Sequence, residues 1–153
     1  MRFLAYSGCR ISEANRVTFS HINWERGEIA IMGDPVTGTK NWERRTIPII
    51  APLRETLERI QRDRIDAHGD RQVLLVRECQ KALDRAARIV GVTRITHHDL
   101  RHLFATTCIE AGVDIPTVAR WLGHKDGGAL LMKRYSHLRA NHSSEAAKKV
   151  TFE

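Results

Sequence analysis

Apolar residues recur at helical spacing over most of the chain, which predicts a mainly helical protein. Leu53, Leu57 and Ile60 share one face of a predicted helix over residues 52–67, with arginine and glutamate on the other face. The same kind of pattern predicts further helical segments, at residues 1–7, 12–17, 78–90, 96–112, 115–122, 126–134 and 141–150, the last as a helix or a tail. Glycines close several of them, among them Gly8 and Gly91.

The front part of the chain carries a strand pattern. Residues 28–32 alternate between apolar and polar, residues 45–49 are a predicted returning strand, and residues 34–39 supply the turn chemistry of a loop or hairpin between them. Pro48 has no N–H to donate, so the second strand is predicted to lie at an edge or to end there. The predicted fold class is therefore mainly α with a small antiparallel β-sheet (α+β).

Composition narrows the class of protein. The 153 residues are 42% hydrophobic and 28% charged, as in a soluble globular domain, and no apolar run is long enough to span a membrane. A net charge of +7 favours a polyanionic partner, although charge alone leaves the partner open. The three cysteines, Cys9, Cys79 and Cys108, show no CxxC spacing, which indicates free thiols and a cytoplasmic protein.

A candidate phosphate-binding pair lies in the helix predicted over residues 96–112. His98 and Arg101 are three residues apart and so share a face, where arginine can neutralise phosphate oxygens and histidine can move a proton. In isolation this spacing is more often that of two solvated residues. Here it belongs to a longer stretch, HDLRHLFAT at residues 98–106.

That stretch resembles the HxLRHxxAT box of the tyrosine recombinases, the phage integrase family. GCRISEA at 8–14 resembles the family's first box, and LGH at 122–124 with a downstream tyrosine resembles its last boxes. The resemblance runs from Gly8 to His137. It implies the integrase catalytic-domain fold and a site-specific DNA recombinase that acts without metal, ATP or cofactor.

The resemblance also implies roles for individual residues. Arg10 and Arg101 match the two arginines that clamp the scissile phosphate, and Lys40 matches the lysine that protonates the departing 5′ oxygen, with Arg44 and Arg45 as competitors nearby. His98 matches the general acid–base group. The adjacent His97 is set aside because it lacks the three-residue spacing to Arg101.

Two further residues complete the predicted site. His124 matches a second donor to the phosphate, with packing beside Trp121 as the alternative. Tyr135 matches the nucleophile that forms a 3′-phosphotyrosyl link to DNA. A free phenol has a pKa near 10, so this nucleophile needs a base and positive charge around it. Tyr135 follows His124 at a longer interval than in many family members, and the Gly127-Gly128 pair is expected to absorb the difference.

The family acts on double-stranded DNA as a tetramer, so DNA and a homotetramer on DNA are the implied partners of the full-length protein. The isolated domain is expected to be a monomer. Residues 1–153 are predicted to be a single catalytic domain excised from a longer protein, because the family's N-terminal core-binding domain has no counterpart here. The DNA target and the kind of element, phage or other mobile DNA, stay open.

Three alternatives compete with this interpretation. His98 and His102 could bind zinc, but the glutamate of an HExxH motif is missing and Arg101 lies between them. Residues 108–122, with a turn at Gly112, could form the helix-turn-helix of a non-catalytic DNA-binding module. A type IB topoisomerase would use the same tyrosine chemistry, although the boxes follow the integrases more closely.

Overall fold

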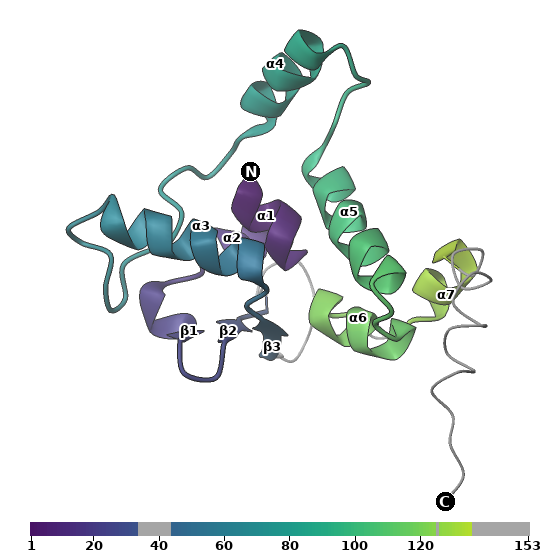
Figure 1. Ribbon diagram of the computed structural model, residues 1–153, viewed down its shortest axis with the longest axis horizontal. Helices are drawn as coiled ribbons and strands as arrows, with labels where there is room; N and C mark the ends of the chain where they lie inside the picture. The colour runs from purple at the N-terminus through teal and green to yellow at the C-terminus, as the bar shows by residue number, and fades with distance from the viewer. Residues whose placement is uncertain (34–43, 125, 136–153) are drawn as a thin grey trace, which may run out of the picture. The chain divides into compact units, whose positions relative to one another are not determined.

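The computed structural model describes residues 1–33, 44–124 and 126–135 (Figure 1). The chain divides into two compact units, Met1–Phe104 and Ala105–Glu153, with the boundary inside one helix. Each unit is described by itself, and the prediction of one catalytic domain stays a prediction. None of the helices in the described ranges is both long and apolar enough to cross a membrane. The predicted segments at 34–39 and 141–150 lie outside the described residues.

The first unit contains short helices, a small sheet and two longer helices. Its elements are α1 (Arg2–Ser7), α2 (Ile11–Ala14), the 3-10 turn η1 (Phe19–His21), β1 (Ile22–Asn23), β2 (Glu28–Ile31), β3 (Arg45–Pro48), α3 (Ala51–Arg62), α4 (Gln80–Val90) and the first part of α5 (His97–Glu110). The sheet is antiparallel, in the order β1-β2-β3. β3 is an edge strand and ends at Pro48, which confirms the prediction from that proline.

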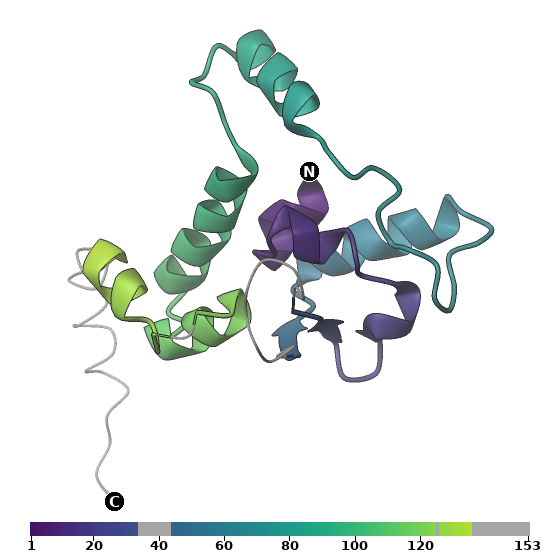
Figure 2. The ribbon, with the colours of Figure 1, turned by 180° about the vertical axis from the view of Figure 1, so that it is seen from behind.

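The core of this unit lies where α1 packs against α3, a contact visible from both sides (Figures 1 and 2). Phe3 and Leu4 of α1 and Leu53 and Leu57 of α3 are almost fully buried. The sheet adds Ile29, which pairs with Ile47 across β2 and β3. Burial of these apolar side chains is the main force that holds the front of the chain together.

α3 ends at Arg62, five residues before the end predicted from its apolar pattern. The reason lies in the next residues. Arg64 donates hydrogen bonds to the carbonyl oxygens of Gln72 (2.7 Å) and Val73 (3.1 Å) and to both carboxylate oxygens of Asp66 (3.0 and 3.2 Å). These tertiary contacts hold the chain in a loop, and so override the local preference for helix.

We expect Leu57→Ala to lower the free energy of unfolding by about 2–5 kcal/mol, because it removes a fully buried side chain between α3 and its neighbours. Chemical denaturation measures this change. Glu58→Ala on the exposed side of the same helix is the control, and is expected to cost less than about 1 kcal/mol, since its ion pair with Arg54 is exposed. An equal loss of unfolding free energy in the two variants would contradict the packing of α3 described above.

The second unit contains the end of α5, α6 (Ile115–Leu122) and α7 (Ala129–Tyr135). α6 has its predicted bounds, because Asp114 caps its start by accepting a hydrogen bond from the Thr117 N–H (2.9 Å), and Gly123 ends it with a φ of 70°. α7 begins three residues later than predicted. Gly128, with a φ of 97°, lies so close to α6 that a Cβ there would meet Ile115 at 3.1 Å.

α5 runs from His97 to Glu110, within the range of 96–112 that the sequence predicts. Thr96 precedes the helix and caps it, as predicted. The Thr96 N–H and hydroxyl donate to the Asp99 carboxylate (2.8 and 2.7 Å) and the Asp99 N–H donates to Thr96 Oγ1 (3.3 Å), which is the reciprocal pattern of a capping box. Gly112, with a φ of 89°, lies in the turn that follows the helix.

Candidate active site

The turn after α1 brings the first predicted arginine beside α5. Gly8 ends α1 in the left-handed conformation, with a φ of 63°, and its carbonyl oxygen accepts a hydrogen bond from Arg101 Nη1 at 2.7 Å. Arg10 lies two residues further on, at the start of α2, and half of its side chain is exposed (51%). Arg101 is only 5% exposed. One buried and one accessible guanidinium therefore lie in the same part of the first unit.

A buried carboxylate organises this part of the molecule. Glu13 is 5% exposed and accepts hydrogen bonds on both of its oxygens. Arg45 at the start of β3 binds it in a two-bond fork, through Nη1 to Oε1 (2.9 Å) and Nη2 to Oε2 (2.7 Å). Arg10 adds its Nη1 to Oε1 (3.2 Å) and its backbone N–H to Oε2 (2.9 Å). Glu13 thus caps α2 and contacts two arginines at once.

The pKa shifts in this cluster reflect burial and charge. Burial alone would raise the pKa of the Glu13 carboxyl, but the hydrogen bonds and charge of Arg45, followed by those of Arg10, lower it below the usual value. Burial, followed by the charge of Arg10, lowers the pKa of Arg101 to about 10, so its guanidinium stays protonated at neutral pH. Three arginines against one carboxylate give a net positive site, which suits an anion such as a phosphate.

The two neighbouring histidines at the start of α5 have different surroundings. His97 is mostly buried, with Nε2 3.1 Å from the Cys79 sulfur and 3.6 Å from Glu78 Oε1. His98 is exposed, and its ring makes an edge contact with His102 at 4.3 Å between centroids. His98 is therefore accessible to a substrate, whereas His97 is held against the residues that precede α4.

These contacts do not support the alternative of a zinc site. His98 and His102 are neighbours, but across the described ranges no group of three or more histidine, cysteine, aspartate or glutamate side chains is placed to hold a metal ion. The three cysteines are free, as predicted. Burial raises the pKa of both Cys9 and Cys108 to about 11, which leaves these thiols protonated and unreactive at neutral pH.

The remaining predicted site residues belong elsewhere in the chain. His124 follows α6 in the second unit, where its backbone N–H donates to the Ala119 carbonyl oxygen (2.9 Å) as part of the helix end. Tyr135 is the last residue of α7, and its side chain lies outside what the structure describes. Lys40 also lies outside the described residues. The structure thus brings Arg10 and Arg101 into the same part of the first unit, and the roles of all the predicted site residues stay predictions.

Arg45 is the member of this cluster whose contact with Glu13 the sequence does not reveal. As a competitor of Lys40 it would need an accessible side chain on a turn. Instead its side chain is 12% exposed and bound to Glu13. The sequence offers only a weak sign that the Arg45 side chain is buried: this arginine begins a strand and pairs with the buried Ile31. Its partner lies 32 residues earlier in the sequence, beyond the reach of local pattern.

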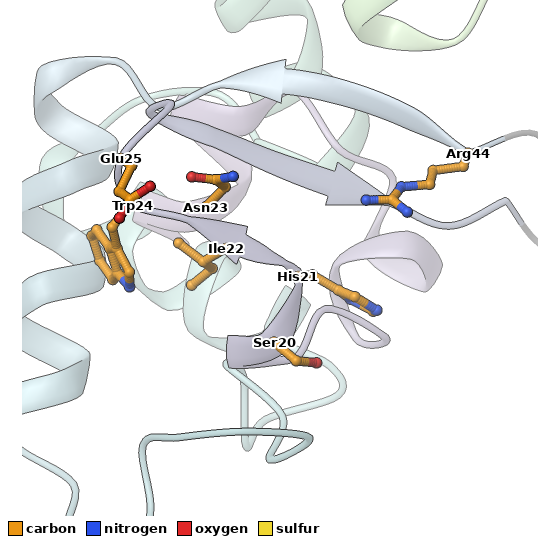
Figure 3. Close-up of a pocket in the computed structure, with 7 residues that line it drawn as sticks. All are labelled: Ser20, His21, Ile22, Asn23, Trp24, Glu25 and Arg44. Carbon is orange, nitrogen blue, oxygen red and sulfur yellow. The ribbon is translucent and has the colours of Figure 1, made fainter.

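A shallow hollow elsewhere in the first unit contains none of the predicted site residues. Figure 3 shows its lining, which comes from η1, β1, the turn that follows β1 and the residue before β3: Ser20, His21, Ile22, Asn23, Trp24, Glu25 and Arg44. Of the two competitors of Lys40, Arg44 lines this hollow and Arg45 binds Glu13. The hollow is therefore separate in its residues from the arginine cluster.

Known proteins resemble this chain in sequence. The model of the phage integrase family matches residues 1–142. Tyrosine recombinase XerA of Pyrococcus furiosus is 29% identical over 153 residues, covering 94% of this chain and 51% of that protein. Tyrosine recombinase XerC of Corynebacterium glutamicum is 26% identical over 133 residues, covering 81% of this chain and 41% of that protein. The chain thus spans about half the length of these curated relatives.

Solved structures show the same fold. The crystal structure of XerA recombinase has a TM-score of 0.71 at 19% identity, covering 97% of this chain and 56% of that one. The catalytic domain of bacteriophage HP1 integrase has a TM-score of 0.66 at 23% identity, covering 97% and 80%. The Tn1549 transposon integrase in complex with transposon right end DNA has a TM-score of 0.72 at 18% identity, covering 94% and 57%.

The similar structures define the fold class of this chain, and the family model defines its family. The mainly helical architecture with a three-stranded antiparallel sheet is that of tyrosine recombinase catalytic domains, as predicted from the sequence. Since the family model matches nearly the whole chain, the chain belongs to the phage integrase family.

Proposed function

We propose that this chain carries the catalytic site of a site-specific DNA recombinase, which breaks and rejoins double-stranded DNA through a covalent tyrosine intermediate. The observation that carries the proposal is the cluster in which Arg10 and Arg101, from distant parts of the sequence, lie beside one buried carboxylate with net positive charge. Membership of the phage integrase family supports the same chemistry. The related Tn1549 integrase was solved with DNA, which supports DNA as the partner.

The proposed reaction exchanges one phosphodiester for another. The Tyr135 phenol oxygen bonds to the phosphorus of the scissile phosphate and the bond to the 5′ oxygen breaks. The phenol proton passes to His98, and Lys40 gives a proton to the departing 5′ oxygen. The products are a 3′-phosphotyrosyl link and a 5′ hydroxyl. Attack by the 5′ hydroxyl of another strand reverses these steps and releases the tyrosine, so rejoining needs no ATP.

The arginines act on the charge that develops during the reaction. Charge builds on the non-bridging phosphate oxygens in the transition state, and fixed guanidinium groups stabilise it more than they stabilise the bound substrate. Arg101 is suited to this role because it is held in place by the Gly8 carbonyl oxygen, and Arg10 because half of its side chain is exposed. His124 is proposed as a further donor to the same phosphate. In this proposal the protein's own cations perform the charge stabilisation.

The proposal extends to assembly. Strand exchange joins two duplexes, so the full-length protein is proposed to act as a homotetramer on DNA, with this chain alone a monomer. The curated relatives are about twice as long as this chain. A test of activity therefore includes a second protein, in which the chain is fused to the part of tyrosine recombinase XerA that it does not match.

The experiment that tests the function detects the covalent link. A duplex is first selected from a random-sequence pool by its binding to the chain, then nicked within the selected sequence so that the short fragment carrying the new 5′ hydroxyl diffuses away after cleavage. The chain and the fusion are incubated with this nicked duplex, with EDTA present, and run on a denaturing gel. A protein band shifted by the mass of the DNA supports the proposal. Its absence from both proteins would favour the non-catalytic DNA-binding module.

His98→Gln is expected to slow adduct formation by about a hundredfold or more, because general acid–base groups contribute on that order. The matched control is His97→Gln, the adjacent histidine whose ring faces Cys79. We expect it to keep the rate within about fivefold, since an acid–base group acts only in reach of the reacting proton. The time course of the gel band gives both rates.

An unchanged rate in His98→Gln would assign the proton transfer to another group. His102, whose ring touches that of His98, is then the next residue to replace. A loss in His97→Gln as large as that in His98→Gln would indicate damage to the start of α5 instead of a catalytic role.

A further inference from the structure

We propose that Arg45 is a positioning residue of the DNA-cleaving site: by occupying both oxygens of Glu13 it keeps Arg10 from closing a two-bond pair with that carboxylate, and so leaves the Arg10 guanidinium available to phosphate. This inference rests on the proposed function, because it concerns the same phosphate-binding site. It adds a residue that does not itself touch the phosphate and acts through Glu13.

The hydrogen bonds around Glu13 divide unequally between the two arginines. Arg45 holds both carboxylate oxygens with guanidinium nitrogens, at 2.7 and 2.9 Å, which is the fork geometry of a strong arginine–carboxylate pair. Arg10 reaches the carboxylate through a single guanidinium nitrogen at 3.2 Å, the longest of the four bonds, while its other contact is a backbone N–H. Arg45 is therefore the main partner of Glu13, and Arg10 is the weaker one.

Exposure separates the two arginines in the same way. Arg45 is 12% exposed and cannot easily reach a bound duplex, whereas Arg10 is 51% exposed. A phosphate arriving from solvent competes with Glu13 for Arg10. It competes successfully only if the carboxylate already has a better partner, because a buried carboxylate without one would draw in the nearest cation.

Charge leads to the same conclusion. Arg10, Arg45 and Arg101 carry three positive charges and Glu13 carries one negative charge, and Arg45 and Glu13 largely cancel each other through their fork. The charge of Arg10 then stays available to the phosphate. Without Arg45 the carboxylate would cancel the charge of Arg10, and the net positive charge of these four side chains would be halved.

The sharpest test combines Arg45→Met with Glu13→Gln. Methionine fills a similar space without charge, and glutamine keeps an acceptor for the Arg10 N–H but cannot form an ion pair. Arg45→Met alone is expected to slow adduct formation at saturating nicked duplex by about tenfold or more. Adding Glu13→Gln is expected to restore most of the rate, since the charge that captures Arg10 is gone. Arg45→Lys keeps a charge but not the fork, and its rate of adduct formation is expected to lie between those of Arg45→Met and the unsubstituted chain.

The matched control is Arg64→Met. Arg64 is 13% exposed and binds both oxygens of Asp66, so it resembles Arg45 in burial and pairing but contacts none of the arginine cluster in the described structure. It is expected to lose stability and to keep the adduct rate within about twofold, since transition-state stabilisation requires contact with the reacting group. All rates are taken well below the melting temperature of each variant, and the duplex concentration for half-maximal rate is measured separately.

The outcomes separate the proposal from a structural role. If Arg45→Met slows the reaction no more than Arg64→Met, the proposal is wrong. If the double variant is as slow as Arg45→Met, Arg45 does not act by neutralising Glu13, and the proposal is also wrong. If Arg45→Met does not fold, Arg45→Lys decides: a rate equal to that of the unsubstituted chain overturns the proposal.

A second readout does not depend on activity. In ¹⁵N-labelled protein, the guanidinium protons of Arg10, assigned by their loss in Arg10→Lys, exchange with water at a measurable rate. We expect slower exchange in Arg45→Met, because Arg10 closes onto Glu13, and fast exchange again in the double variant. If neither the unsubstituted chain nor the fusion forms an adduct, the proposed function fails and this measurement still decides the inference: unchanged or faster exchange in Arg45→Met overturns it.

Discussion

Tyr135→Phe is expected to abolish the covalent link to DNA while leaving DNA binding almost unchanged. The substitution removes one oxygen atom, which is the atom that bonds to phosphorus in the proposed reaction, and phenylalanine offers no replacement. Loss of a nucleophile costs at least on the order of a thousandfold in rate. Affinity for DNA depends mainly on cationic contacts to phosphates, and this change leaves the charge of the protein as it was. Denaturing gels measure the adduct and fluorescence anisotropy measures binding.

The chain offers a matched control, because it has two tyrosines. Tyr6→Phe makes the same chemical change in α1, and is expected to form the adduct at the rate of the unsubstituted chain. Protease digestion and mass spectrometry of the adduct then identify the linked peptide. A nucleotide found on the peptide with Tyr6, or an adduct formed normally by Tyr135→Phe, would refute the assignment of the nucleophile.

The sequence predicts the elements whose ends are set by local chemistry. The bounds of α6 follow from a capping aspartate and a closing glycine, and the start of α5 follows from the capping box of Thr96 and Asp99. Both signals lie within a few residues of the helix ends that they fix. The family boxes are equally local, and for this reason the fold class and the family can be identified from the sequence alone.

Prediction fails where distant residues decide the structure. α3 stops early because Arg64 binds carbonyl groups eight and nine residues further on. β1 escapes prediction because a strand of two residues is too short to show alternation. The late start of α7 depends on how closely Gly128 approaches α6, and the role of Arg45 depends on a carboxylate on another element. In each case the deciding feature cannot be inferred from periodicity or spacing.

Arg101→Met is expected to lower the rate of adduct formation by about 10²–10³-fold, the usual effect of removing a fixed donor from a developing oxyanion. It should also reduce the dependence of DNA binding on salt by about one phosphate contact. The effect on folding is expected to be smaller. Burial and the nearby Arg10 already disfavour this charge, as its lowered pKa of about 10 indicates, so relief of that cost offsets the lost hydrogen bond to Gly8.

A control variant that loses the same charge at another position distinguishes the proposed role of Arg101 in the reaction from a general electrostatic attraction to DNA. Arg59→Met removes one positive charge from the exposed side of α3 in the same unit, and is expected to keep the adduct rate within about twofold. Arg101→Lys keeps the charge without the planar fork, and is expected to restore only part of the rate. Equal losses in Arg59→Met and Arg101→Met would mean that net charge alone matters. A full recovery in Arg101→Lys would mean that the fork is dispensable, and with it the clamp proposed for Arg10 and Arg101.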